Sequence, residues 1–179
     1  EELLLCRDRL GEKPLYFGKV GNSFIFGSEL KALKKFPDFH PRISRKALTE
    51  YVQFNYIPSP LSIYEDIFKL EAGHYIRIPY STLEVEHVKY WCLKESVLAS
   101  KNSEIMDEER AISLLEDAIE SSIKSQMLSD VPLGAFLSGG IDSSLVVAKM
   151  QKHSKDKIKT FTIGFDDIEY DESQYASKV

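Results

Sequence analysis

A short run of small and polar residues in the second half of the chain could hold a phosphate group. It reads Ser138-Gly139-Gly140-Ile141-Asp142-Ser143-Ser144. Its glycines let the backbone approach an anion closely. The free N–H groups at the start of a helix point to the same place, and the helix dipole adds roughly half a positive charge there. Because the three serine hydroxyls can also donate to phosphate oxygens, we expect the run to bind a polyphosphate.

Asp142 needs a separate explanation, because a bare carboxylate repels phosphate. Hard divalent cations bridge carboxylate and phosphate oxygens, so Asp142 fits the run if it ligates Mg²⁺ beside the phosphates. The run is not a Walker A loop: Gly134 and Gly139 have the right spacing, but Gly140 stands where that loop requires lysine. It does not have the G-x-G-x-x-G pattern either.

The residues around the run predict the elements that position it. Residues 131–137 predict a buried strand, 142–153 a helix and 159–165 a second buried strand. A strand, a helix and a strand in this order form a βαβ unit with parallel strands. The run then lies at the carboxyl end of the first strand, where open α/β sheets bind their ligands.

The first half of the chain has a different pattern. Short apolar runs separated by turn residues predict strands, and Pro58 and Pro60 exclude a regular helix around them. The strands are expected at 3–6, 15–20, 24–26 and 75–78, with 84–90 as the hairpin partner of the last. Helices are expected at 28–33, with Ser28 as N-cap, and at 45–54, after Ser44. Residues 1 to about 92 are thus expected to form an antiparallel α+β unit.

A change in composition separates the two halves. Residues 94–103 are polar without a clear period, which indicates a linker. From Asp107 onward apolar residues recur at spacings of three and four, which predicts a helix. Acidic residues, which the helix dipole favours at this end, lie near its start: Glu104, Asp107, Glu108 and Glu109. We expect a first domain at 1–95, a linker at 96–106 and a second domain at 107–179.

Length, charge and cysteine content narrow the class of protein. The 179 residues suffice for one domain and part of another. Lys and Arg number 23 against 28 Asp and Glu, a net charge of −5, so we expect no nucleic-acid partner. No run approaches the roughly 18 apolar residues of a membrane-spanning helix, and Cys6 and Cys92 are too few for a disulfide framework. The first residue is not methionine, so we expect an internal piece of a longer, cytoplasmic protein.

The run from Ser138 to Ser144 resembles the PP-loop, S-G-G-x-D-S, of ATP pyrophosphatases. Other segments narrow the resemblance. They are RDRLGEKPLY at 7–16, FGSELKAL at 26–33, YIPSP at 56–60, LEAGHY at 70–75, SDVPLG at 129–134, FTIGF at 161–165 and YDE at 170–172. In this order they resemble the glutamine-hydrolysing asparagine synthetases over nearly the whole chain.

The resemblance implies a mixed α/β and α+β fold. Residues 1–95 would be the C-terminal part of an antiparallel N-terminal-nucleophile glutaminase domain, and residues 107–179 the start of a parallel-sheet PP-loop domain of the adenine nucleotide alpha hydrolase type. The implied activity is that of a carbon–nitrogen ligase. It makes asparagine from aspartate with ammonia from glutamine, through an adenylated carboxylate, and releases AMP and pyrophosphate. Its partners would be glutamine, aspartate or another acid, and ATP with Mg²⁺, and a homodimer stays open.

The same resemblance implies roles for individual residues. Phe136 and Ile163 would lie beside the adenine, mainly through backbone groups. The pyrophosphate end of ATP would be held by Ser138, Gly139, Gly140, Ser143 and Ser144. Asp142 would ligate Mg²⁺, and Asp142 and Ser138 would be the catalytic residues. The family's glutaminase nucleophile is an N-terminal cysteine upstream of anything here, so neither Cys6, expected as a small buried residue in a strand, nor Cys92 has that role. The chain alone is expected to be inactive.

Three other interpretations stay open. The first is an enzyme of the same fold that amidates another acid. The second is a nucleotide-binding module without catalysis. The third is a sulfur-inserting PP-loop enzyme acting on tRNA, which the acidic charge and the glutaminase-like first half disfavour. The four histidines have no ligand-like spacing, and a helix start is favoured over an acceptor pocket for the acidic run Asp166, Asp167, Asp171 and Glu172.

Overall fold

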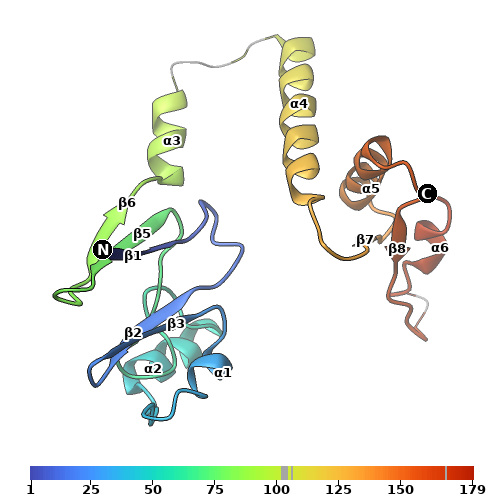
Figure 1. Cartoon of the computed structure of the whole chain (residues 1–179). Coiled ribbons are helices and arrows are strands. Elements are labelled where there is room, and N and C mark those ends of the chain that lie inside the picture. Colours follow the sequence, from blue (N-terminus) through green and yellow to red (C-terminus); the bar gives the residue numbers. More distant parts are fainter. Residues whose placement is uncertain (102–104, 106, 168) are drawn as a thin grey trace. The chain divides into compact units, whose positions relative to one another are not determined.

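The computed structural model describes residues 1–101, 105, 107–167 and 169–179. The chain forms two compact units, Glu1–Ser103 and Glu104–Val179 (Figure 1). The first contains β1 (Glu2–Cys6), β2 (Tyr16–Val20), β3 (Ser23–Gly27), α1 (Leu30–Leu33), α2 (Arg45–Phe54), β4 (Ile67–Lys69), β5 (His74–Pro79), β6 (Glu86–Lys89) and α3 (Leu93–Ser100). The second contains α4 (Glu108–Gln126), β7 (Gly134–Phe136), α5 (Ile141–His153), β8 (Lys159–Phe161) and α6 (Ser173–Ala176).

Two small antiparallel sheets form the first unit. In one, β5 lies between β1 and β6, and in the other β2 lies between β3 and β4. The hairpin expected at 75–90 is present as β5 and β6, and β2 and β3 form a second hairpin. β1 pairs with β5 along its whole length, from Glu2 opposite Pro79 to Cys6 opposite Tyr75. The sequence therefore predicted the strands at 3–6, 15–20 and 24–26, but local patterns do not reveal the long-range partner of β1.

The core of the first unit consists of two clusters of apolar side chains. Side chains two residues apart lie on the same face of a strand, so Ile76 and Ile78 of β5 are both buried, at 0% and 1% exposure. They pack with Leu5, Phe17 and Leu70. Burying a side chain of this size contributes about 1.5–3 kcal/mol. The second cluster contains Ile25, Leu33, Phe39 and Ile67.

Three local predictions in the first unit have different outcomes. Ser44 is the N-cap of α2, since its hydroxyl accepts from the Ala47 N–H at 3.2 Å. The prediction for Ser28 is wrong: α1 begins at Leu30, its N-cap is Glu29, and no side chain caps it. Cys6 does lie in a strand, but it is exposed rather than buried. The alternation of β1 turns Leu5 into the core and Cys6 to the opposite face.

The first part of the expected linker is helical rather than irregular, and residues 102–104 and 106 lie outside the described residues. α3 covers Leu93–Ser100, and no residue of it is fully buried. The expected boundaries at 1–95, 96–106 and 107–179 stay predictions. The helix expected from Asp107 is present as α4, and the Asp107 carboxylate caps it by accepting from the Arg110 N–H at 2.7 Å. Glu104 lies outside the described residues.

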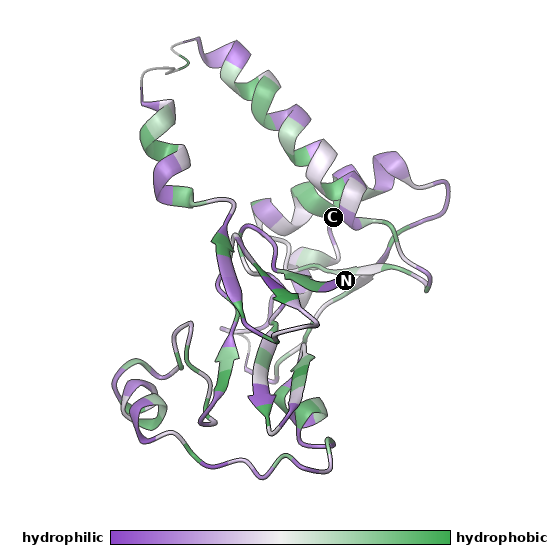
Figure 2. Ribbon diagram, turned by 60° about the vertical axis from the view of Figure 1, so that its left-hand side comes forward, coloured by the Kyte–Doolittle hydropathy of each residue, from purple (hydrophilic) through white to green (hydrophobic). Residues whose placement is uncertain are grey.

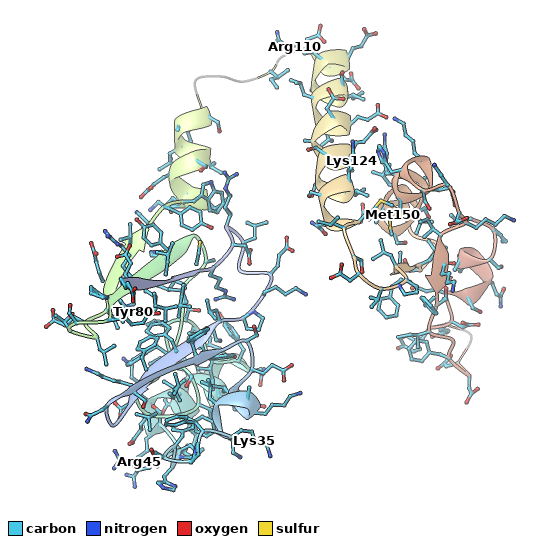
Figure 3. The ribbon with its side chains drawn as sticks, viewed as in Figure 1. Lys35, Arg45, Tyr80, Arg110, Lys124 and Met150 are labelled. Carbon is cyan, nitrogen blue, oxygen red and sulfur yellow. The ribbon has the colours of Figure 1, made fainter. Side chains whose placement is uncertain are left out.

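In the second unit, charged side chains join α4 to α5. The Lys149 side chain is only 12% exposed and contacts the carboxylates of Glu116 and Glu120. Lys152 also pairs with Glu120, at 2.8 Å. Met150, on α5, is buried, whereas Lys124 on α4 is exposed (Figure 3). α5 is therefore joined to α4 by ion pairs of Lys149 and Lys152, which lie toward the end of α5 away from its first turn.

β7 and β8 form a parallel pair, as predicted, with Gly134 opposite Lys159 and Phe136 opposite Phe161. The expectation that both strands are buried is wrong. Phe136 is 78% exposed and Phe161 is 56% exposed. Parallel strands are buried when helices cover both faces of a sheet, and this sheet has two strands among the described residues. α4 is similar to the two strands in its exposure: it carries apolar as well as polar residues (Figure 2), and none of its residues is fully buried.

Within the described residues, no helix has both the length and the apolar character needed to cross a membrane.

Candidate functional site

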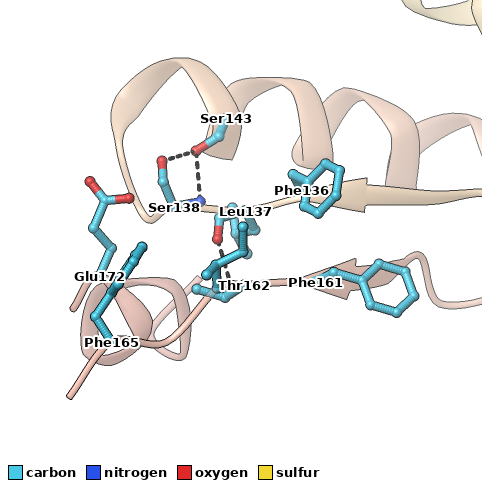
Figure 4. Close-up of a pocket in the computed structure, with 9 residues that line it drawn as sticks. Phe136, Leu137, Ser138, Ser143, Phe161, Thr162, Phe165 and Glu172 are labelled. Atoms are coloured by element: carbon cyan, nitrogen blue, oxygen red, sulfur yellow. Dashed lines mark hydrogen bonds between the residues drawn. The ribbon is translucent and has the colours of Figure 1, made fainter. Parts of the chain in front are cut away.

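A cavity of about 330 Å³ lies at the carboxyl ends of β7 and β8 (Figure 4). One wall comes from the end of β7 and the start of α5, and another from the end of β8. The lining residues are Phe136, Leu137, Ser138, Ser143, Phe161, Thr162, Ile163, Phe165 and Glu172. Of the eight predicted site residues, four line this cavity: Phe136, Ser138, Ser143 and Ile163. The cavity therefore lies where the βαβ pattern predicted a ligand site.

Two hydrogen bonds hold the strand ends together, and all three residues that make them line the cavity. The Leu137 N–H donates to Phe161 O at 2.9 Å. The Thr162 hydroxyl donates to Leu137 O at 2.7 Å. Gly134, in β7, makes the close approach possible, because a Cβ there would lie 2.6 Å from the Phe161 ring. Thr162 lies in the segment FTIGF that the sequence analysis named, but only Ile163 of that segment was predicted as a site residue.

The turn after β7 is organised by two serines. The Ser138 and Ser143 hydroxyl oxygens are 2.9 Å apart. Ser143 Oγ accepts from the Ser138 N–H and donates to Gly140 O, at 3.3 and 3.2 Å. Ser138 Oγ accepts from the Gly140 N–H at 3.3 Å. These hydroxyls thus shape the turn in this structure, in addition to being possible phosphate donors.

The two glycines of the turn have different reasons to be glycine. Gly139 has a φ of +81°, which a residue with a side chain rarely adopts. A Cβ on Gly139 would also lie 2.6 Å from the backbone of Tyr175, which is part of α6. A Cβ on Gly140 would approach only Ser138 Oγ, at 3.3 Å. Close approach to an anion was the expected reason for both residues, but at Gly139 the structure shows packing against α6.

The first turn of α5 presents backbone donors near the cavity. Gly140 is the N-cap, and the first intrahelical bond runs from the Ser144 N–H to Gly140 O at 3.0 Å. The N–H groups of residues 141–143 therefore have no acceptor within the helix. With the positive end of the dipole of this 13-residue helix, they favour an anion.

Asp142 lies in the first turn of α5 and is exposed. Its carboxylate makes no hydrogen bond or ion pair with any residue that the structure describes, and it is not among the residues that line the cavity. Ser144 is partly buried one residue beyond Ser143, and its hydroxyl also has no partner within the described part of the chain. The structure therefore places both residues beside the turn without showing a contact that assigns them a role.

The acidic run after β8 serves partly as a helix start, as predicted. Asp171 accepts from the Ser173 hydroxyl at 2.8 Å and from the Ser173 N–H at 3.1 Å. These two bonds, the hydroxyl first, hold the pKa of the Asp171 carboxyl below its ordinary value. Its neighbour Glu172 instead lines the cavity near Ser138 (Figure 4). One run thus contains a residue that accepts hydrogen bonds from Ser173, the first residue of α6, and a residue that lines the candidate site.

The types of side chain in and beside the cavity fit a nucleotide bound together with Mg²⁺. The aromatic and aliphatic side chains of Phe136, Ile163 and Phe165 suit a flat base, and the serines with the start of α5 suit phosphates. Carboxylate oxygens are the ligands that Mg²⁺ prefers, and Asp142 and Glu172 offer them. Mg²⁺ usually takes one or two carboxylates together with substrate phosphates. The described residues contain no group of three or more His, Cys, Asp and Glu that could hold a metal without such help.

Comparison with known proteins supports the division of the chain. The model of the glutamine amidotransferase domain family matches residues 1–91, and that of the asparagine synthase family matches residues 114–179. The chain is 40% identical over 177 residues to a putative asparagine synthetase [glutamine-hydrolyzing] 2 of Methanocaldococcus jannaschii, which covers 97% of this chain and 33% of that protein.

Two proteins of Bacillus subtilis are also similar to this chain over most of its length. Asparagine synthetase [glutamine-hydrolyzing] 3 is 31% identical over 170 residues, covering 92% of this chain and 26% of its own length. Asparagine synthetase [glutamine-hydrolyzing] 1 is 32% identical over 174 residues, covering 97% and 26%. The chain thus spans a third or less of the length of these curated relatives. Its amidotransferase and synthase segments occur in the order that the sequence motifs indicated, and the chain belongs to the family of glutamine-hydrolysing asparagine synthetases.

Proposed function

We propose that the second unit is the nucleotide-binding part of an enzyme that makes asparagine from aspartate, using ATP and ammonia released from glutamine. The observation that carries this proposal is the turn from Ser138 to Ser143, which joins a parallel strand to the start of α5 beside a cavity. Membership of the family supplies the substrate class. The first unit would be the later part of an N-terminal-nucleophile glutaminase domain, and the second the start of a PP-loop domain.

In this proposal, ATP lies along the cavity with its base between the ends of β7 and β8. Phe136 and Ile163 lie at or just beyond these strand ends, and both line the cavity. The phosphates lie at the turn, where Ser138, Gly139, Gly140, Ser143 and Ser144 surround the start of α5. The β- and γ-phosphates would occupy this position, which leaves the α-phosphorus facing the acceptor carboxylate.

Asp142 is the proposed Mg²⁺ ligand. When bound, Mg²⁺ would act as a Lewis acid that offsets charge on the departing pyrophosphate. The role of this chain is then mostly electrostatic. The free N–H groups of α5 and the Ser138 hydroxyl are fixed before the substrate arrives, so little reorganisation is needed as charge develops. The acceptor carboxylate forms a bond to the α-phosphorus while the bond to pyrophosphate breaks. Ammonia then displaces AMP and forms the amide.

A product analysis of the full-length protein tests this proposal. The protein is incubated with Mg-ATP, glutamine and aspartate, and nucleotides and amides are identified by mass spectrometry. We expect AMP, pyrophosphate and asparagine in equal amounts. AMP without asparagine would keep the adenylation but require another acceptor acid. ADP as the nucleotide product, or no turnover with any acid, would contradict the proposal.

A further inference from the structure

We infer that Thr162 is a positioning residue for the base of the nucleotide, acting through the backbone of Leu137. The inference rests on the proposed function, because it takes the cavity between β7 and β8 as the base site. The Thr162 hydroxyl donates to Leu137 O at 2.7 Å, across 25 positions of sequence. Figure 4 shows this bond between the two chain segments that follow the strands, among the residues that line the cavity.

The bond lies at the point where the two strands separate. The parallel ladder ends with Phe136 opposite Phe161, and the Leu137 N–H makes one further bond, to Phe161 O. Beyond it, one backbone enters the turn at Ser138 and the other continues to Ile163. The Thr162 hydroxyl is the last link before this separation. It therefore sets the spacing between the segments that carry Phe136 and Ile163.

A threonine hydroxyl is suited to this role. Threonine is branched at Cβ, which restricts its χ1 angle, so its hydroxyl is held in a defined direction. Leu137 is only 5% exposed. A carbonyl in such surroundings that loses its donor must find another or be exposed to water. Without the hydroxyl, the strand ends keep the Leu137 N–H bond to Phe161 O but lose the bond beyond it, so we expect the spacing between the walls beside the base to loosen.

The expected consequence concerns affinity rather than the chemical step. The side chains that line the base site contact the base equally in the ground state and the transition state. Weakening these contacts therefore raises KM and leaves kcat largely unchanged. For Thr162→Val, which keeps the shape and removes the donor, we expect the KM for ATP to rise about two- to tenfold, the range for one hydrogen bond. Thr162→Ser keeps the donor and should restore a KM close to that of the unmodified protein.

Inhibition by the two products separates positioning from general loosening. AMP carries the base, and pyrophosphate carries only the phosphate end. In the full-length protein, Thr162→Val should weaken inhibition by AMP by the same factor as the KM for ATP and leave inhibition by pyrophosphate unchanged. Thr160→Val is the matched control, since Thr160 is exposed on the same strand and its hydroxyl has no partner among the residues described. It should behave like the unmodified protein.

The outcomes distinguish the inference from the proposed function. If the unmodified protein does not convert ATP to AMP, the proposed function fails. If it does, but Thr162→Val leaves the KM for ATP and inhibition by AMP unchanged, the positioning role of Thr162 is overturned. Equal weakening of AMP and pyrophosphate would overturn it as well. Should Thr162→Val fold poorly, the pair Thr162→Ser and Thr162→Ala makes the same comparison: Ala should raise the KM and Ser should not.

Discussion

The hydroxyl oxygens of Ser138 and Ser143 lie 2.9 Å apart, one in the turn after β7 and the other in the first turn of α5. Ser143 Oγ also accepts from the Ser138 N–H and donates to Gly140 O. A phosphate-binding motif assigns the Ser143 hydroxyl to the ligand, but in this structure the same hydroxyl also makes hydrogen bonds within the turn. The loop is therefore organised by hydrogen bonds of its own side chains.

A comparison of two serines tests this organisation. Ser143→Ala removes the acceptor of the Ser138 N–H, so we expect the KM for ATP to rise about tenfold, as for a polar group left unpaired. Ser144→Ala removes a hydroxyl without a partner in the described residues and should have a smaller effect. Equal effects of the two substitutions, measured by steady-state kinetics on the full-length protein, would mean that phosphate contact rather than turn geometry governs affinity.

A Cβ at Gly139 has no room. Gly139→Ala requires an alanine at a φ of +81° and places its Cβ 2.6 Å from the Tyr175 backbone. The conformation alone costs about 1–2 kcal/mol, and the overlap adds to it, so we expect a lower Tm and loss of ATP-dependent turnover. Gly21→Ala is the matched control: its φ is +57°, but a Cβ there meets nothing within 4 Å. A Gly139→Ala protein no less stable than Gly21→Ala would contradict the packing against α6.

Removal of the Asp142 carboxylate tests the proposed Mg²⁺ site. We expect Asp142→Ala to abolish AMP formation in the full-length protein while leaving the release of ammonia from glutamine intact, because Asp142 lies in the second unit. Asp117→Ala, an exposed carboxylate on α4 without a partner in the described chain, is the control. AMP formation is measured against Mg²⁺ concentration. Loss of both activities in a folded Asp142→Ala protein would argue against a specific role.

Lys149 should matter more for stability than an exposed lysine. Its contacts with Glu116 and Glu120, the first foremost, raise the pKa of the Lys149 ammonium. Lys149→Met leaves Glu116 without this partner, so we expect a fall in Tm several times that caused by Lys124→Met on the exposed side of α4. Added salt screens such pairs, and the difference between the two variants should therefore shrink as the salt concentration rises. A difference that persists at 1 M salt would point to packing instead.

The Asp8 carboxylate makes stability depend on pH in the acid range. It accepts from the backbone N–H groups of Leu10, Glu12 and Lys13 at 3.0–3.3 Å. These bonds, that of Glu12 foremost, lower the pKa of the Asp8 carboxyl against the opposing effect of burial. A carboxyl whose pKa is lowered by folding stabilises the protein above the unfolded pKa and loses that contribution as the pH falls through the folded value.

Urea unfolding between about pH 5 and pH 2 measures this contribution. Stability should fall with pH in the unmodified protein, and the fall should be shallower in Asp8→Asn, which cannot titrate. Glu12→Gln is the control, because only the backbone of Glu12 contacts Asp8. Identical pH profiles for the unmodified protein and Asp8→Asn would show that other carboxyls determine the acid sensitivity.

Elements whose signal is local were predictable from the sequence. The start of α2 after Ser44, the start of α4 near Asp107 and the pairing of β5 with β6 depend on residues close together in the chain. The position of the Ser138 turn followed in the same way from the order strand, helix and strand. Ser28 failed as a cap because α1 is a single short turn that begins at Leu30 after Glu29, and a signal of one residue does not fix the start of so short a helix.

The sequence by itself determined the family motifs, the parallel strand pair and the residues of the turn, because each depends on residue type and short-range spacing. The tertiary structure alone decided the pairing of β1 with β5, the packing of Gly139 against Tyr175 and the bond from Thr162 to Leu137. These contacts join residues far apart in the chain. A single threonine such as Thr162 or a single glycine such as Gly139 gives no periodic signal in the sequence. Its role can be assigned only when the structure shows which distant carbonyl or backbone segment it contacts.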